Sequence, residues 1–374
     1  MTEQRSSSFS LSPSTLLAAS MLLFLAILLW QLRSLLVILM VAVVLAAALA
    51  PFVDRAERLR IPRFLAVILA YLLLGLFLTS ILLLIGPTVI EQIQLLLGRL
   101  PGYLEATRSF LRGWLIGVGA SESEALAWFD RLFNLQALTG WVIRSSQQVL
   151  VRSYDLTKAV VRGLISFVLA ILISGYMLAG SQGLVRGLVD LLPAPWNDRV
   201  AAQMPNVGQR MGVYIQGRVL VSSILGIAIT IGLNFLGLSE FSLGLGAIAA
   251  VTNLIPFFGP ILGSIPALIV AAGQSGGWTL VWVLLLFVVI QNVETYLLDP
   301  LLVGDRVRVT PLYQLLAVLG GTQVLGIIGA LIVPAWVAGG AVLLEELYIK
   351  PKQNLEAARQ ETEITSARSK VMAP

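Results

Sequence analysis

Long apolar runs separated by short polar interruptions dominate the chain. At a rise of about 1.5 Å per residue, a helix of about 20 apolar residues crosses the hydrocarbon core of a bilayer. Runs of about this length predict membrane spans at 14–31, 35–53, 64–87, 159–180, 214–238 and 278–298. The pattern therefore predicts an all-α membrane protein with about six full spans.

Two longer apolar segments, 241–273 and 311–348, do not have the pattern of single straight helices. The first is interrupted by Asn253, two prolines (Pro256 and Pro260) and Gly259. Each proline removes a backbone donor and clashes with the preceding turn. Within a membrane, the freed backbone groups must find partners in the protein or around a water-filled cavity. Because transporters use such broken helices to expose backbone dipoles to a substrate, this segment favours transport.

The distribution of arginine indicates that both segments turn back. With a cytoplasmic N-terminus, the arginines between 55 and 63 lie inside, as the positive-inside rule requires. Arg306 and Arg308 also lie inside if 241–273 forms a hairpin at 256–260, and outside if it crosses fully. Its arms, at about 15 residues and roughly 22 Å, are too short for a core of about 30 Å. We therefore expect two re-entrant hairpins and cytoplasmic termini; eight full spans are the alternative.

The interval 88–158 is amphipathic. Apolar residues recur at helical spacing, as at Ile93, Leu96, Leu97, Leu100 and Leu104, with charged residues between them. We interpret it as a helical module on the membrane surface, with a partner-binding or regulatory cap as the alternative.

The chain then divides into five parts. They are a polar tail (1–13), scaffold spans (14–87), the amphipathic module (88–158), a transport core (159–349) that contains both hairpins, and a polar tail (350–374). The last tail has the position and polarity of a disordered terminus.

Composition excludes several other functions. Of 374 residues, 57% are hydrophobic and 12% charged, whereas soluble domains carry about 25% charged residues. The chain has no cysteine and no histidine. We therefore expect no disulfide, no metal centre built from the usual ligands and no cofactor. Without histidine, proton coupling would need a carboxylate. The net charge of +5 is spread over short loops, which indicates membrane topology and not nucleic-acid binding. Phosphate-loop, nucleophile-elbow and metalloprotease motifs are lacking, so we do not expect an enzyme.

Charged residues inside spans are the first candidates for function. Glu294 lies in the 278–298 span beside Gln291 and Asn292. A membrane carboxylate is costly and usually faces the bundle interior or an aqueous path, although one near a span end can reach the interface. Arg218 opens another span; it could anchor at the interface, meet an anionic substrate or pair with Glu294. Asp299, before a proline, is interpreted as a helix-terminating residue.

Polar and small residues at the two breaks complete the candidate site. Asn253 in the first break, with Thr322 and Gln323 in the second, could line one polar site or form interhelical hydrogen bonds. The predicted solute-binding residues are Asn253, Pro256, Phe257, Gly259, Pro260, Gln291, Asn292, Thr322 and Gln323. Glu294 and Arg218 are predicted to act in ion coupling or gating. Gly259, Gly263, Gly320 and Gly321 are predicted hinges.

The motifs resemble those of the autoinducer-2 exporter family of bacterial membrane proteins. They are the run from Asn253 to Pro266, Gln291-Asn292-Val293-Glu294 with the following Asp299-Pro300, and Gly320-Gly321 through Val333-Pro334. The resemblance covers essentially the whole chain. Two positions depart from it: Arg218 stands where the family has glutamine, and Ala179-Gly180 replaces an acidic residue.

The resemblance implies an inner-membrane exporter of small molecules that moves by an elevator-like slide in an assembly of several protomers, with a pentamer suggested. Some relatives are associated with sodium/proton exchange. We therefore predict a secondary transporter that exports a small polar solute such as autoinducer-2, with sodium or proton coupling left open. The alternatives are a sodium/proton antiporter that uses Glu294 and a non-transporting membrane scaffold.

Overall fold

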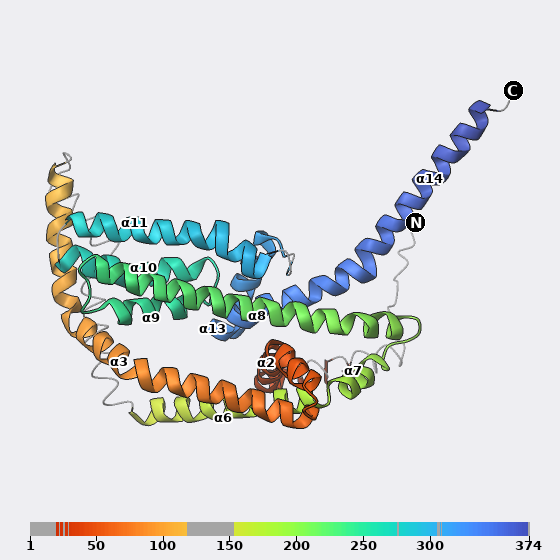
Figure 1. The fold of residues 1–374 in the computed structure, drawn as a ribbon, viewed down its shortest axis with the longest axis horizontal. Helices are drawn as coiled ribbons and strands as arrows, with labels where there is room; N and C mark the ends of the chain where they lie inside the picture. The colour runs from red at the N-terminus through yellow and green to blue at the C-terminus, as the bar shows by residue number, and fades with distance from the viewer. Residues whose placement is uncertain are drawn as a thin grey trace, which may run out of the picture.

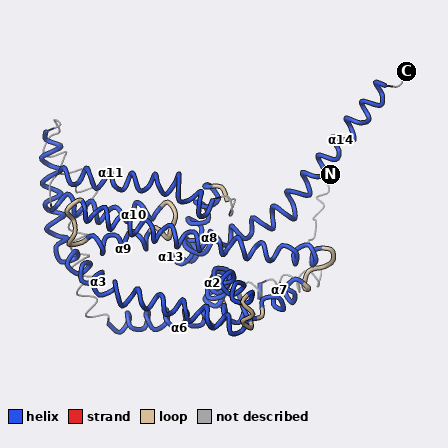
Figure 2. The backbone as a smooth tube through the Cα atoms, in the orientation of Figure 1, coloured by secondary structure: helices blue, strands red, loops and turns tan. Residues whose placement is uncertain are grey.

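The computed structural model describes residues 20–117 and 153–372, apart from 22, 25, 26, 29, 275, 276, 305, 306 and 308. Within these residues the chain is helical and contains no β-strand (Figures 1 and 2). The α-helices are α2 (Arg33–Arg58), α3 (Arg63–Gly117), α6 (Ser153–Ala179), α7 (Ser181–Val189), α8 (Trp196–Phe235), α9 (Ser242–Thr252), α10 (Phe258–Gln274), α11 (Gly277–Val293), α13 (Pro311–Leu344) and α14 (Lys350–Met372). Three π-helical turns join them: η1 (Glu294–Leu298), η2 (Pro300–Gly304) and η3 (Glu345–Ile349).

The length and apolar character of the helices confirm a polytopic helical membrane protein. Five stretches are long and apolar enough to cross a membrane: Arg33–Arg58, Arg63–Phe110, Trp196–Phe235, Trp278–Gly304 and Pro311–Glu361. A sixth span results if Gly163–Ala179 and Gly183–Val189, which meet at 88°, are counted together. Of the first predicted span, 14–31, the described residues are helical and 14–19 lie outside the described part.

Segment 241–273 folds into a helical hairpin, here called hairpin 1. Its arms are α9 and α10, which pack against each other, and Figure 2 shows the loop between them. The reversal runs from Asn253 to Phe257, where Phe257 has a φ of 66°. It lies slightly earlier than predicted because Pro260 falls in the first turn of α10, where a helix does not need the missing N–H. Gly259 packs against the backbone of Asn253, so a side chain there would displace the reversal.

Segment 311–348 also reverses, at Gly326, and its two arms form hairpin 2. Gly326 has φ 66° and ψ −150° inside the stretch assigned to α13, a conformation open essentially to glycine alone. Gly321 and Gly329 then lie face to face, each against the other's carbonyl group. In a continuous helix, residues eight apart are separated by about 12 Å. The structure therefore contains both predicted hairpins.

α8 is the central helix. It packs against α9, α13 and α2, and in Figure 1 it runs between the α9–α11 group and the α3–α6 pair. Small residues allow these close crossings: Gly212 meets the Ala47 carbonyl of α2, and a Cβ at Gly226 would lie 2.5 Å from the Cβ of Ala250 in α9. One apolar cluster joins hairpin 1 to α8 and α11, and another joins α2, α8 and hairpin 2.

α3 connects the N-terminal helices to hairpin 1. Its first turns contribute Ala66 and Val67 to an apolar cluster with α2 and α6. The helix continues without interruption into the predicted amphipathic module, where Leu96 is buried against hairpin 1. The remainder of the module, 118–152, lies outside the described residues.

The C-terminal tail is helical, contrary to the disorder that its polarity indicated. α14 extends away from the body of the protein in Figure 1. Alanine, glutamate, glutamine, lysine and arginine dominate this segment, and these are strong helix formers. Ion pairs one turn apart, Glu346 with Lys350 and Lys352 with Glu356, add to its stability.

Candidate functional site

A buried charged cluster joins α8 to the end of α11. Arg218 is 2% exposed and Glu294 is 3% exposed. The Nη1 atom of Arg218 donates a hydrogen bond of 3.0 Å to Oε1 of Glu294 and lies 3.5 Å from Oδ1 of Asp299. The side chain of Asp299 is 41% exposed. The hypothesis that Arg218 pairs with Glu294 is therefore confirmed, and neither residue reaches the interface as an exposed anchor.

A π-helical turn brings the two carboxylates to the same face. Residues five apart point about 140° away from each other around an α-helix. In η1 the N–H of Asp299 bonds to the carbonyl of Glu294, the i to i+5 bond of a π-helix. Pro300 follows at once and begins η2; since a proline cannot continue an α-helical ladder, the widened turn is a physical consequence of its position.

Close packing of η2 on α8 fixes the distance between the charges. A Cβ at Gly217 would lie 2.8 Å from the carbonyl oxygen of Leu302. Glycine at this position lets the backbone of η2 lie directly on α8, so that the neighbouring residue, Arg218, faces the carboxylates. The sequence predicted Asp299 only as a helix-terminating residue, because an α-helical period does not align it with Glu294.

Several buried polar atoms of this region have no partner among the described residues. They are Nε and Nη2 of Arg218, Oδ1 of Asn253, Oε1 of Gln291 and Oδ1 of Asp299. Nε and Nη2 form one edge of the guanidinium, the edge that binds two oxygen acceptors side by side. Buried polar groups are nearly always hydrogen-bonded, so these atoms need partners beyond the described residues, which water or a polar solute could supply.

The tip of hairpin 1 points toward this cluster. α9 runs antiparallel to α8, with Ala250 beside Gly226 and Gly246 beside Thr230. Asn253 lies about 4.5 Å beyond Ala250 along α9, and Arg218 lies about 12 Å beyond Gly226 along α8. The tip therefore lies between the levels of Gly226 and Arg218. Asn253 is buried, with its oxygen unpartnered.

Other predicted solute-binding residues make local contacts. Asn292 donates to the Val288 carbonyl at 2.7 Å, and Thr322 donates to the Val318 carbonyl at 2.7 Å, each within its own helix. Gln291 donates to the hydroxyl of Thr295 at 3.3 Å.

The packing of the remaining predicted residues differs between the two hairpins. Pro256 and Gly259 are buried, Pro260 is half-buried, and Phe257 and Gln323 are exposed. No extensive contact joins hairpin 1 to hairpin 2 in the described chain, so Asn253 and Thr322 are not packed into one site.

The predicted hinges fall into two groups. Gly259, Gly263 and Gly321 lie against neighbouring backbone, whereas a Cβ at Gly320 would meet only open space.

Apolar spans, two helical hairpins and a buried charged cluster together define a multi-pass helical membrane protein of the transporter class. Comparison with known proteins agrees. Residues 19–349 match the model of the AI-2E family transporter, and the chain belongs to this family.

Proteins similar to this chain include three with transport in their names. The Bacillus subtilis protein named "Putative transport protein YueF" is 28% identical over 305 residues, which cover 79% of each chain. YrrI of the same organism, named in the same form, is 37% identical over 161 residues, or 43% of this chain and 45% of its own. MT0215 of Mycobacterium tuberculosis, also so named, is 28% identical over 321 residues, or 83% of each chain. The chain is thus a membrane transporter of the permease type.

Proposed function

We propose that this protein is a secondary transporter of the bacterial inner membrane that exports a small polar solute such as autoinducer-2. The observation that carries this proposal is the Nε–Nη2 edge of Arg218, which is buried among membrane-spanning helices and has no hydrogen-bond partner among the described residues. A buried charged group without full hydrogen bonding is unfavourable. A polar solute that accepts hydrogen bonds from this edge would satisfy it. A carrier brings such a solute to the edge, whereas a passive membrane anchor does not.

The second support is the charge balance of the cluster. One arginine faces two carboxylates, and the buried Glu294 stays close to it. The more exposed Asp299 lies further from Nη1 and makes no hydrogen bond through Oδ1 within the described residues. Arg218 therefore keeps a counter-ion when no solute is bound, a condition for a carrier that must also move while empty.

An elevator-like movement is the proposed mechanism. Hairpin 1, α8 and α11 share one apolar cluster, to which α3 contributes Leu96, whereas the first turns of α3 belong to a separate cluster with α2 and α6. In the proposal the first cluster, with hairpin 2, carries the solute, and the N-terminal helices form the scaffold and the contacts between protomers. Both termini are placed in the cytoplasm, and the protein is expected to be a homo-oligomer, a pentamer by family resemblance.

A sodium/proton antiporter is the second candidate, and the burial of Glu294 favours it. A carboxylate 3% exposed within a span is the type of group that binds and releases a coupling cation. The pairing with Arg218 opposes this role, because the arginine already neutralises Glu294. The exporter therefore remains the better explanation of the cluster.

Transport into liposomes tests the proposal. Purified protein is reconstituted, and uptake of labelled autoinducer-2 is measured with and without imposed sodium and proton gradients. We expect saturable uptake in the wild type and its loss in Arg218→Lys, which keeps the charge but not the two-pronged edge. The matched control is Arg99→Lys, at an exposed ion pair with Glu240, which should transport normally.

The gradients separate the candidates. Gradient-dependent accumulation that Glu294→Gln abolishes indicates a coupled exporter, and uptake indifferent to gradients indicates a facilitator. Sodium-driven proton movement without solute uptake would replace the proposal with the antiporter. No solute or ion flux in correctly assembled protein would refute both and favour a membrane scaffold.

A further inference from the structure

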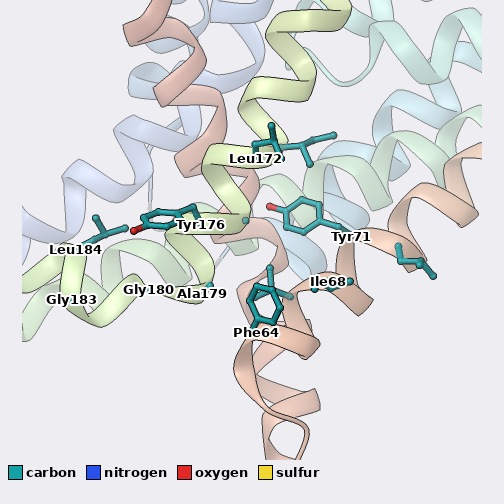
Figure 3. A pocket seen from close by; sticks show the side chains of 13 residues that line it. Phe64, Ile68, Tyr71, Leu172, Tyr176, Ala179, Gly180, Gly183 and Leu184 are labelled. Carbon is teal, nitrogen blue, oxygen red and sulfur yellow. The ribbon is translucent and has the colours of Figure 1, made fainter.

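A groove lined by α3, α6 and α7 shares no residue with the charged cluster. Its volume is about 1030 Å³, at the upper end of the usual range of ligand pockets, about 300–1,000 Å³. Figure 3 shows the aromatic and aliphatic side chains that line it, Phe64 and Tyr71 from α3 and Leu172 and Tyr176 from α6 among them. Leu72, Leu172 and Tyr176 are exposed, so the groove opens onto the apolar surface of the membrane-spanning helices.

The groove is lined by apolar side chains along its length and is polar at one end. Along α3 it extends from Phe64 to Leu72, about 12 Å. Phe64 directly follows the first residue of α3, so the groove ends where this span ends. Gly183 lines the same end from α7, and a Cβ there would meet only open space. The groove is therefore long and open enough for the half of an extended hydrocarbon chain that lies nearest the headgroup.

The sharp corner between α6 and α7 forms the polar end. The two helices meet at 88°, which places α7 across the direction of the spans. Arg63 fixes this corner: its Nε donates to the Leu178 carbonyl at 3.0 Å and its Nη2 to the Ser181 hydroxyl at 3.1 Å. α7 begins at Ser181, and its N-cap residue Gly180, which lines the groove, provides no side-chain cap. The first N–H groups of a helix attract anions.

Excess positive charge lies beside this corner. Asp54 and Glu57 both lie within ion-pair distance of Arg63, at 3.7 and 2.9 Å. Within the described chain, no carboxylate lies within that distance of Arg58 or Arg60, which flank the same turn between α2 and α3. The local charge is therefore positive at the depth where phospholipid headgroups lie.

We propose that this groove binds a single phospholipid with an anionic headgroup. One acyl chain lies along α3 and α6, and the phosphate lies between the α2–α3 turn and the start of α7. Charge complementarity favours a lipid over a second copy of this chain. A copy inserted in the same orientation carries its own arginine-rich turn at the same depth, whereas an anionic lipid brings the opposite charge.

Native mass spectrometry of delipidated protein tests the site, with dioleoylphosphatidylglycerol and dioleoylphosphatidylcholine as probes. Gly183→Leu fills the groove, and Gly187→Leu is the matched control, on the same helix with open space but outside the groove. We expect phosphatidylglycerol binding about tenfold weaker in Gly183→Leu, because the new side chain displaces about two methylene groups. The control should bind like the wild type. Should Gly183→Leu fail to fold, Leu172→Trp narrows the groove from α6.

The headgroup is tested by Arg58→Gln combined with Arg60→Asn. Asparagine suits the positive φ of 66° at position 60. This variant should lose the preference for phosphatidylglycerol over phosphatidylcholine while retaining the chain site. Equal lipid binding by Gly183→Leu and Gly187→Leu would overturn the proposal. So would equal affinity of the wild type for both lipids, or a change of oligomeric state in Gly183→Leu with unchanged lipid binding, which would make the groove a contact between copies.

Discussion

The cluster around Arg218 predicts that its members contribute unequally to stability. In Arg218→Gln, the buried Glu294 loses the only cation within ion-pair distance of it among the described residues. Breaking a buried ion pair by removing one partner costs about 3–5 kcal/mol, and we expect this range here. In Glu294→Gln, Arg218 keeps Asp299 at 3.5 Å, and the new amide oxygen can still accept from Nη1. That change should therefore cost less, about 1.5–3 kcal/mol, the range for one hydrogen bond to a charged group.

A double-mutant cycle measures the coupling directly. The double variant Arg218→Gln/Glu294→Gln leaves only the half-exposed Asp299 without a cation, so it should be more stable than Arg218→Gln alone. Contacting residues couple by about 0.5–3 kcal/mol, and we expect a value near the upper limit. The free energy of unfolding is measured by titration with a denaturing detergent in mixed micelles, followed by circular dichroism.

The exposed pair of Arg99 and Glu240 is the internal control. Its atoms lie 2.7 Å apart, closer than those of the buried pair, but the two side chains are 48% and 40% exposed. Solvent screening limits such pairs to about 0.2–1 kcal/mol. The reasoning fails if the exposed pair couples as strongly as the buried one, or if Glu294→Gln is as costly as Arg218→Gln.

Two further predictions concern the hairpins. Gly321→Ala places a methyl group against the Gly329 carbonyl and should lower the free energy of unfolding by at least about 1–3 kcal/mol. Gly320→Ala adds its methyl group in open space and should leave stability unchanged or raise it slightly. Equal effects of the two changes in the same titration would contradict the face-to-face packing of hairpin 2. Gln92→Ala removes the acceptor of the Gly244 N–H, which lies 2.7 Å away, and should lower stability by about 0.5–1.5 kcal/mol. Hydrogen exchange in α9 should become faster. The same change at the exposed Gln94 is the control and should leave exchange unchanged.

The two hairpins could be predicted from the sequence, and the details of their reversals could not. Proline and glycine positions, arm length and the placement of arginine all indicated a return of the chain. In hairpin 2, however, the sequence alone does not show which glycine forms the reversal: Gly320, Gly321, Gly326 or Gly329. Only the packing of Gly321 on Gly329 selects Gly326 as the residue with positive φ.

Only part of the charged cluster could be predicted from the sequence, because the rest depends on local backbone geometry. Arg218 and Glu294 are conspicuous because charges are rare in apolar spans, and their pairing follows from the cost of leaving either alone. The contact of Asp299 with Arg218 was not predicted, because its alignment with Glu294 exists only in a π-helical turn. A proline directly after a span carboxylate, as Pro300 follows Asp299, is the signal that could have indicated this turn.

The short arms of hairpin 1 constrain the order in which the chain enters the membrane during synthesis. α9 has 11 residues and α10 has 17, lengths of about 17 and 26 Å, so neither arm crosses a core of about 30 Å. The reversal therefore lies at membrane depth, where the polar side chain of Asn253 is unfavourable in lipid until the neighbouring helices, α8 among them, pack around hairpin 1. Because α8 is synthesised first, the ribosome supplies the covering helix before the segment that needs it, and a circular permutant that begins at α9 would lack this protection.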